Sequence, residues 1–424
     1  MLKSFQISNF NSIKESITFS MESIQELTEH PEFVTNLDKD NKLLKVASIY
    51  GPNASGKTNL LHALEFVREL ISGRLSRENP RYRHNNHERY TPFEFTLEKD
   101  NLMKVSLLFA RKGVEYWYRL TAEFFDEGNS MMIIHDEFLG VKRFSEKNYD
   151  VVFSREKNVI IANEILDIIG ASKLPVSNDM TLLRHLYVNY INVEEGVNLA
   201  SVEGEHLEFV ADIYEEIRSL SLISNLSVMS SNIFRFNADR IIQNKEFIIQ
   251  TLNNLDIQIS DIYAKELGKR DYQIFCTHKV NEETYELRVE QESQGTALLI
   301  YLLSIIASRK NKPTIFLIDE LDSHLHPKLV KEIISIFNSK LNKFNQLIFN
   351  SHDMWNMVPE NFRRDQIWFT YRNEELATEL TCLSDIVNYK GERIRKDAKY
   401  SKQYMEGKYG ADPFIRKGLD WYGE

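Results

Sequence analysis

The sequence predicts an α/β fold: a mixed and partly parallel sheet with flanking helices, an antiparallel β meander in an N-terminal lobe, and a helical insertion. Three apolar runs, each the length of a buried strand, cover residues 44–50, 314–320 and 346–350. From residue 91 to 156, runs rich in β-branched and aromatic side chains alternate with turn signals, which indicates the meander. From about 158 to 268 the apolar spacing becomes helical.

The expected elements follow in order along the chain. Alternating patterns predict an opening antiparallel pair over 2–10 and 17–21, and the meander strands over 103–110, 114–125 and 131–139. Helices are predicted over 59–70, 207–220, 241–255 and 297–308, and further strands over 272–278 and 284–289. The predicted domains are an N-terminal lobe (1–157), a helical insertion (158–270), a C-terminal lobe (271–385) and a C-terminal tail (386–424). No sustained heptad array is present, so no long coiled-coil arm is expected.

Composition limits the classes of function. The chain has 424 residues, 42% hydrophobic and 27% charged, which is ordinary for a globular protein. A formal net charge of −10 argues against a surface dominated by non-specific nucleic-acid contact. The absence of a run of about 18 apolar residues and of a signal-peptide core predicts a cytoplasmic protein without membrane contact. Cys276 and Cys382 are expected to be core thiols.

Residues Gly51 to Thr58 match the phosphate-binding loop G-x-x-x-x-G-K-[ST] at every fixed position. A predicted strand enters the loop and a predicted helix leaves it, which is the context that the motif requires. Backbone N–H groups of residues 53–56 (Asn53, Ala54, Ser55 and Gly56) are expected to face the phosphates of a nucleotide triphosphate. Lys57 would reach the β and γ oxygens, and Thr58 would hold Mg²⁺.

Three further motifs lie in the C-terminal lobe. Ser293 is placed as an N-cap of the helix that follows Gly295. The run 314–320 ends in Asp319 and Glu320, the profile of a Walker B strand, in which the aspartate binds Mg²⁺ directly or through water and the glutamate polarises the attacking water. His352 follows the strand 346–350 at the carboxyl edge of the same predicted sheet. Each motif alone has an ordinary explanation. A Gly-Thr pair at the start of a helix is usually part of a cap, and a histidine after a strand is usually an ordinary surface or core residue.

Order and spacing give these motifs more weight than each has alone. Phosphate loop, insertion, Ser-x-Gly-Thr, Walker B, a following Asp322 and a strand with His352 closely resemble the ABC-type ATPase heads of the SMC, RecF and OLD-like branch. The resemblance implies ATP and Mg²⁺ as ligands, with Glu320 and His352 in catalysis. It also implies a homodimer of heads or a higher homo-oligomer, in which Ser293, Gly295 and Asp322 of one copy meet the nucleotide on the phosphate loop of another.

Four further motifs are present: Asn9-Phe10-Asn11-Ser12, Leu325-His326-Pro327, Asp365-Gln366-Ile367-Trp368-Phe369 and residues 404–414 (Tyr-Met-Glu-Gly-Lys-Tyr-Gly-Ala-Asp-Pro-Phe). These motifs resemble those of a narrower group, the abortive-infection ATPases of the RloA and AbiLi type and the related PARIS ATPase AriA. That resemblance implies bacterial anti-phage defence, a separate effector such as a TOPRIM-like or other nuclease, and a phage protein or nucleic acid as trigger.

The sequence departs from the head family in two places. The usual glutamine between the phosphate loop and the insertion is missing, since no glutamine occurs from Glu26 to Ile242. A backbone carbonyl near residues 91–95 is one candidate to replace it. The second departure is Ser351 before His352, where the family often has threonine; the hydroxyl preserves the hydrogen-bonding capacity.

Several readings stay open at this stage. The basic loop 74–89 contains five arginines and is either a solvated surface or a contact for nucleic acid or an acidic partner. The favoured function is an ATP-driven sensor or scaffold of a phage-defence module, and the alternative is a RecF-like DNA-repair ATPase that clamps duplex DNA. A self-contained OLD-type nuclease is disfavoured, because the segment after His352 is too short for a TOPRIM domain.

Overall fold

The computed structural model describes residues 1–75, 90–97, 100–125, 131–157, 159–162, 176–191, 205–224, 231–268, 271–310, 312–388 and 390–410. Of the basic loop 74–89, only Arg74 and Leu75 belong to the described residues, so its two readings are not distinguished. Residues 411–414 of the C-terminal motif also lie outside them.

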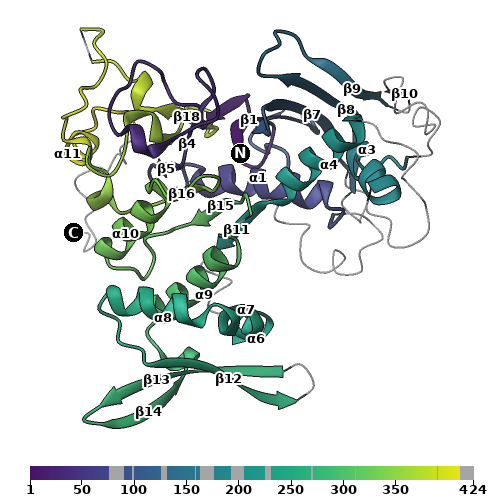
Figure 1. Ribbon diagram of the computed structural model, residues 1–424. Helices are drawn as coiled ribbons and strands as arrows, with labels where there is room; N and C mark the ends of the chain where they lie inside the picture. Colours follow the sequence, from purple (N-terminus) through teal and green to yellow (C-terminus); the bar gives the residue numbers. More distant parts are fainter. Residues whose placement is uncertain are drawn as a thin grey trace, which may run out of the picture.

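A six-stranded sheet forms the centre of the molecule (Figure 1), in the order β11-β15-β16-β5-β17-β18. Every neighbouring pair is parallel except β17 with β18. The carboxyl ends of β5, β15 and β16 therefore meet at one edge, where ligands bind in open parallel sheets. The strands are β5 (Val46–Tyr50), β11 (Leu220–Ser224), β15 (Ile315–Asp319), β16 (Gln346–Asn350), β17 (Ile367–Arg372) and β18 (Thr378–Cys382).

A second, seven-stranded sheet is antiparallel throughout, in the order β10-β9-β8-β7-β6-β1-β2. Side chains alternate across it: Val105 and Leu107 are buried on one face, whereas Lys104 is exposed on the other. The predicted opening pair and meander are thus confirmed as parts of one sheet. Its strands are β1 (Leu2–Ser8), β2 (Ile17–Ser20), β6 (Leu102–Arg111), β7 (Val114–Phe125), β8 (Met131–Arg143), β9 (Asp150–Glu156) and β10 (Val159–Ala162).

Helix α1 (Lys57–Ile71) lies between the two large sheets. Its apolar residues share one core with the inner face of the seven-stranded sheet, with α3 (Leu182–Leu186) and α4 (Glu205–Arg218), and with one face of the six-stranded sheet. The opposite face of the six-stranded sheet packs against α9 (Gln294–Ser308) and α10 (Pro327–Asn338) in a second core. The helix after the phosphate loop and the helix after Ser293 are therefore on opposite faces of the central sheet.

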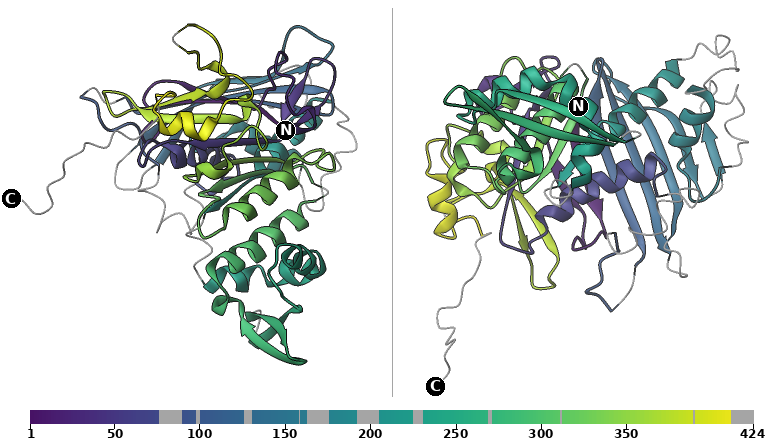
Figure 2. Two further views of the ribbon diagram at one scale, coloured as in Figure 1. Left: turned by 90° about the vertical axis from the view of Figure 1, so that its left-hand side faces the viewer. Right: turned by 90° about the horizontal axis from the view of Figure 1, so that it is seen from below.

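A smaller unit projects away from the two large sheets (Figures 1 and 2). It consists of a three-stranded antiparallel sheet, β12-β13-β14, next to short helices that pack toward α9. Its elements are α6 (Ser231–Phe236), α7 (Ala238–Gln243), α8 (Lys245–Asn254), β12 (Asp261–Gly268), β13 (Asp271–Val280) and β14 (Glu283–Arg288). The remaining elements are the pair β3 (Val34–Asn36) and β4 (Lys42–Leu44), and α11 (Tyr400–Met405).

The segment 158–270 is not purely helical, contrary to the prediction. It contains β11, which is an edge strand of the central sheet, as well as β10 and β12. The predicted helix 207–220 ends at Arg218, and the five residues from Leu220 to Ser224 pair with β15. The predicted helix 241–255 is divided at Asn244 into α7 and α8. A five-residue apolar run does not show by its spacing whether it continues a helix or begins a strand, which explains the error.

Two composition-based expectations can be compared with the structure. Cys276 and Cys382 are both buried and free, as predicted. No helix within the described residues is long and apolar enough to cross a lipid bilayer.

Candidate nucleotide site

The phosphate loop connects the carboxyl end of β5 to α1 and lies directly against the β17–β18 hairpin. Backbone φ angles are positive at Gly51 (153°), Ala54 (62°) and Gly56 (103°). A Cβ atom on Gly56 would lie 2.1 Å from Thr378 Oγ1, and one on Gly51 would lie 2.4 Å from the Thr370 carbonyl oxygen. Both glycines are therefore required by the close approach of the hairpin as well as by their backbone angles.

A chain of hydroxyl groups fastens the loop to this hairpin. Ser55 Oγ and Thr370 Oγ1 lie 2.6 Å apart, and Thr378 Oγ1 donates to the Ser55 carbonyl at 2.9 Å. Ser12 Oγ lies 2.7 Å from Thr378 Oγ1 and accepts from Asn59 Nδ2 at 2.6 Å. A buried network whose members are all paired rigidifies the backbone around it. The loop is thus held in shape by β17, β18 and the turn after β1.

Lys57 is the first residue of α1, and only 5% of its surface is exposed. Its Nζ donates to the carbonyl oxygens of Gly51 and Pro52, both at 2.8 Å. Burial lowers the pKa of Lys57 to about 8, although the carboxylates of Glu320 and Asp319 act in the opposite direction. The ammonium group is therefore held inside its own loop, where a phosphate can exchange with the two carbonyls.

Thr58 and Asp319 lie in direct contact at the sheet edge. Thr58 Oγ1 donates to Asp319 Oδ1 at 2.8 Å, and Asn350 Nδ2 donates to the same oxygen at 2.6 Å. Asn350 Oδ1 accepts the backbone N–H of Glu320, and Asn350 Nδ2 also lies 3.4 Å from Thr58 Oγ1. Asn350 is only 1% exposed. This one carboxamide at the end of β16 therefore connects the start of α1 with the end of β15.

The Thr58 hydroxyl and the Asp319 carboxylate fit Mg²⁺, which prefers hard oxygen ligands and is often held by one or two protein groups plus substrate phosphates and water. No group of three or more His, Cys, Asp or Glu side chains in the described part of the chain could hold a metal ion. A metal at this edge would therefore take its remaining ligands from the nucleotide and from water.

Asn350 provides a test of this arrangement. We expect Asn350→Ala to weaken the apparent affinity for Mg²⁺ by about 10-fold or more, because residues that orient a metal ligand typically contribute 10- to 100-fold to metal affinity. Nucleotide binding in EDTA should change much less, since Lys57 and the loop backbone are untouched. Titration of Mg²⁺ at fixed ATP, with and without EDTA controls, measures the difference. Equal Mg²⁺ dependence in the two proteins would mean that Asn350 has no role at the metal.

The acidic and histidine residues beyond Asp319 surround the same edge. Glu320 has a left-handed backbone angle (φ 52°), and its side chain is exposed. Asp322 accepts the backbone N–H of His352, with its two carboxylate oxygens 3.3 and 3.2 Å from the nitrogen. The side chain of His352 is exposed. The loops after β15 and β16 are thus tied together, and both present polar side chains beside the phosphate loop.

Ser293 caps α9 as predicted. Its Oγ accepts the backbone N–H of Thr296 at 3.1 Å, and Ser293 itself is exposed. A Cβ atom on Gly295 would lie 2.4 Å from the His324 carbonyl oxygen, so the helix start lies against the loop that follows Walker B. Ser293 and Gly295 therefore lie beside the loop that carries Asp322, whereas α1 packs against the other face of the sheet.

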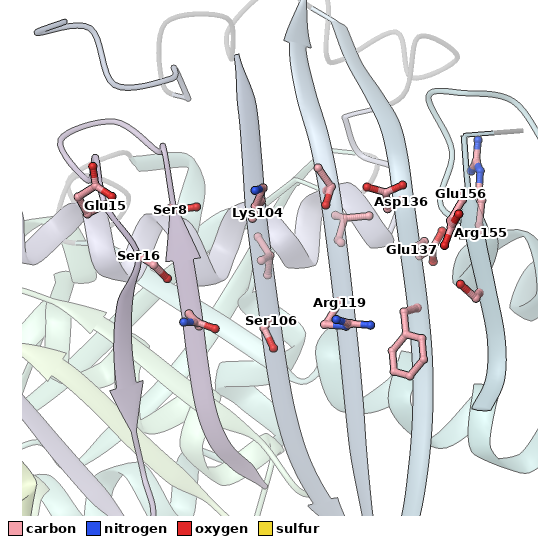
Figure 3. Close-up of a pocket in the computed structure, with 16 residues that line it drawn as sticks. Ser8, Glu15, Ser16, Lys104, Ser106, Arg119, Asp136, Glu137, Arg155 and Glu156 are labelled. Carbon is pink, nitrogen blue, oxygen red and sulfur yellow. The ribbon is translucent and has the colours of Figure 1, made fainter. Parts of the chain in front are cut away.

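A hollow of about 690 Å³ lies elsewhere, on the outer face of the seven-stranded sheet (Figure 3). Arg119 lies there with its guanidinium carbon 4.5 Å from the ring centroids of both Trp117 and Phe138. Asp136 and Glu156 line the same hollow and face each other on adjacent strands. This mixture of charges does not form a phosphate cradle, and the sheet separates the hollow from α1.

Comparison with known proteins agrees with the site. Residues 46–354 match the family described as "AAA domain, putative AbiEii toxin, Type IV TA system". The chain belongs to this AAA family. The matched region contains the phosphate loop, Walker B and His352. A P-loop family of this kind implies a bound nucleotide and usually Mg²⁺, and the predicted α/β ATPase-head fold is confirmed by the arrangement of the central sheet around that loop.

Solved structures of SMC heads are also similar. The SMC head domain from Thermotoga maritima is 14% identical, with a TM-score of 0.44, and the match covers 90% of this chain and 98% of that one. An SmcHead bound to the C-winged helix domain of ScpA is 15% identical, with a TM-score of 0.42 and coverage of 90% and 97%. An Smc head domain bound to the C-terminal domain of ScpA, from Pyrococcus furiosus, is 13% identical, with a TM-score of 0.37 and coverage of 90% and 96%. No curated protein matched the sequence.

The structure brings the loop residues, Thr58, Asp319, Glu320, Asp322 and His352 to one sheet edge, and leaves Ser293 on the other face of the sheet. Asn350, Thr370 and Thr378 are additional members of the site that the sequence analysis did not assign. Asn350 could have been found, since it ends a buried strand as Asp319 does. The Thr91 carbonyl, a candidate substitute for the missing glutamine, accepts the backbone N–H of Asn11 at 2.7 Å. The carboxamide of Asn350 contacts both predicted metal ligands, Thr58 and Asp319.

Proposed function

We propose that this chain is an ATPase whose heads close in pairs around ATP, and that it serves in the bacterial cytoplasm as sensor and scaffold of an anti-phage, abortive-infection system. It controls a separate effector, a TOPRIM-like or other nuclease, and responds to a phage protein or nucleic acid. The family description, which names a putative AbiEii toxin, and the resemblance of the terminal motifs to the RloA, AbiLi and AriA group support the biological part of the proposal.

The observation that carries the proposal is the placement of α1 and α9 on opposite faces of the central sheet. A helix N-terminus that presents a hydroxyl and a glycine N–H attracts anions; at α9 the exposed Ser293 hydroxyl also contacts the N–H and the hydroxyl of Thr296. The N-terminus of α1 serves the phosphates bound in its own loop. The exposed N-terminus of α9 begins on the other face, so it is placed to serve a phosphate carried by a second copy. A nucleotide bound between two copies contacts the N-terminus of α1 from one copy and the N-terminus of α9 from the other.

The residues at the sheet edge have different roles in ATP hydrolysis. Backbone N–H groups of residues 53–56 and the Lys57 ammonium hold the phosphates, and Thr58 and Asp319 hold Mg²⁺, which when bound neutralises charge on the β and γ oxygens. Glu320 accepts a proton from the attacking water. His352 contacts the terminal phosphate from the loop after β16, and Asp322 positions that loop through the His352 N–H.

The described part of the chain after His352 contributes to the ATPase head. Strands β17 and β18 complete the central sheet. Tyr404, on α11, stacks on Phe369 with ring centroids 5.4 Å apart, and Tyr409 packs on the same ring at 5.2 Å. The described residues beyond His352 are thus used to build the head itself.

Ser293 tests the proposal directly. We expect Ser293→Asp to keep the helix cap, because aspartate is as good an N-cap as serine, and to place a negative charge against the phosphate of the second copy. ATP-dependent association should be lost while ATP binding to the phosphate loop stays intact. Sedimentation velocity with Mg²⁺ and a non-hydrolysable ATP analogue measures association, and equilibrium binding measures affinity.

Ser293→Thr is the matched control, since it keeps both the cap and the neutral hydroxyl, and it should associate like the wild type. If the wild type stays monomeric at saturating nucleotide, the shared site does not exist. Strong stimulation of turnover by duplex DNA would favour the RecF-like alternative over the defence role.

A further inference from the structure

Trp355 is an exposed aromatic residue close to the nucleotide site in sequence. It lies in a 3₁₀ turn, η7 (Met354–Asn356), three residues beyond His352, and 81% of its surface is exposed. Within the described residues its ring makes no contact with another ring or cation. Tryptophan is enriched in the buried centres of protein interfaces, so an exposed tryptophan on an ordered turn is a candidate for burial by a partner.

The turn that carries Trp355 is held rigidly. Asp353 caps it: Oδ1 accepts the backbone N–H of Trp355 at 2.8 Å. Asn356, only 5% exposed, donates through Nδ2 to the Pro327 carbonyl at 3.1 Å and to Asp353 Oδ2 at 3.1 Å. These bonds connect the turn to the first residue of α10. Because the backbone is already ordered, little conformational entropy would be lost when the indole is buried by a partner.

The position of the turn suggests which partner that is. Met354 packs against the core that contains α9 and α10, so the turn belongs to the side of the sheet that presents Ser293. The exposed side chains of His324 and His352 lie in the loops that follow β15 and β16, and the Asn356–Pro327 hydrogen bond places the turn of Trp355 beside the end of the first of these loops. Any second copy that brings its own α9 to the phosphate loop must approach this edge, and it would meet Trp355 there.

We propose that Trp355 is an anchor residue that a second copy of this chain buries when two heads close around ATP. This inference rests on the proposed function, because it requires nucleotide-dependent closure. Tryptophan is enriched among the few residues that dominate the affinity of protein interfaces, and truncation of such a residue typically weakens binding by about 30-fold or more. Trp355→Ala is therefore expected to raise the dissociation constant of the ATP-bound pair by at least about 30-fold.

The test uses the full chain with Glu320→Gln, so that ATP persists. Sedimentation equilibrium in MgATP compares this protein with versions that also carry Trp355→Ala or Phe344→Ala. Phe344 is the matched control: it is an aromatic residue, 54% exposed, in the loop before β16 at the amino end of the sheet. We expect Phe344→Ala to pair normally. Acrylamide quenching, compared between the parent and a Trp355→Phe version, isolates the Trp355 fluorescence, which should become protected only with MgATP.

The results for Trp355→Ala and for the parent protein distinguish this inference from its alternatives. Normal pairing of Trp355→Ala, with Trp355 still accessible to acrylamide in the pair, overturns the inference and leaves the shared nucleotide site intact. Weaker ATP binding by Trp355→Ala at concentrations where the chain is monomeric would assign the indole to the nucleotide base and would also overturn it. A parent protein that never pairs with MgATP would overturn both this inference and the proposed function.

Discussion

Glu320→Gln is expected to bind ATP with nearly normal affinity and to hydrolyse it about 100-fold more slowly, or slower still. Glutamine keeps the shape of the side chain and a hydrogen-bonding end, but it cannot accept the proton of the attacking water. The backbone at residue 320 is fixed by the bond from its N–H to Asn350, so the loop should keep its conformation. ATP should then accumulate on the protein, and the two heads should stay closed.

Steady-state phosphate release and equilibrium ATP binding measure the two halves of this prediction. Glu332→Gln, an equally conservative change at an exposed position on α10, is the control and should hydrolyse ATP at the wild-type rate. A variant with Arg119→Ala, in the hollow on the outer sheet face, should likewise be unaffected. Near-normal turnover by Glu320→Gln would remove Glu320 from the proton transfer and leave His352 as the next residue to test.

The parts of the fold that the sequence predicted well are those with a strong local signal. The phosphate loop has four fixed positions in eight residues, and the strands 315–319 and 346–350 are short apolar runs that end in polar groups. Ser293 was predicted as an N-cap, and its side chain accepts the N–H of Thr296. Proline is favoured at the first helical position, and Pro327 begins α10. In each case the information lies within a few neighbouring residues.

The parts that the sequence did not predict depend on pairing between distant residues. Strand β11 is a strand because it pairs with β15, about a hundred positions later, and nothing in its five residues reveals that partner. Thr370 and Thr378 belong to the site only because β17 and β18 lie against the phosphate loop. Asn350 likewise gains its role from Thr58 and Asp319, which arrive from two other elements. Such contacts follow from the topology of the sheet rather than from local spacing.

Lys57→Ala should weaken ATP binding itself by about 100-fold, in contrast to Glu320→Gln. A hydrogen bond to a charged group contributes about 1.5–3 kcal/mol, and the ammonium can reach both the β and γ oxygens. Closure of the heads should be lost as well, because no nucleotide would be present to share. Lys331→Ala, at an exposed position on α10, is the control and should bind ATP normally. Unchanged affinity in Lys57→Ala would mean that the loop binds phosphate through its backbone alone.

The low pKa of Lys57 leads to a prediction about the pH dependence of ATP affinity, which can be tested on the wild-type protein. Burial sets the pKa of this amine to about 8 in the free protein, and the negative phosphates of ATP must raise it in the complex. The complex therefore binds more protons than the free protein at pH values above about 8, so binding takes up a proton there and affinity falls with rising pH, by up to about 10-fold per unit. Below pH 8 the amine is already charged, and affinity should not change through this group.

Calorimetry in two buffers of different ionisation enthalpy measures the proton uptake at each pH. We expect an uptake of about half a proton per ATP at pH 8 and of close to one proton at about pH 9, because Lys57 loses its proton in the free protein over this range. The terminal phosphate of ATP is fully ionised at these pH values and contributes nothing. In Lys57→Ala the uptake should disappear at protein concentrations high enough to saturate the weaker site. Uptake that persists in the variant would have to come from another group, and the buried amine would then already be charged in the free protein.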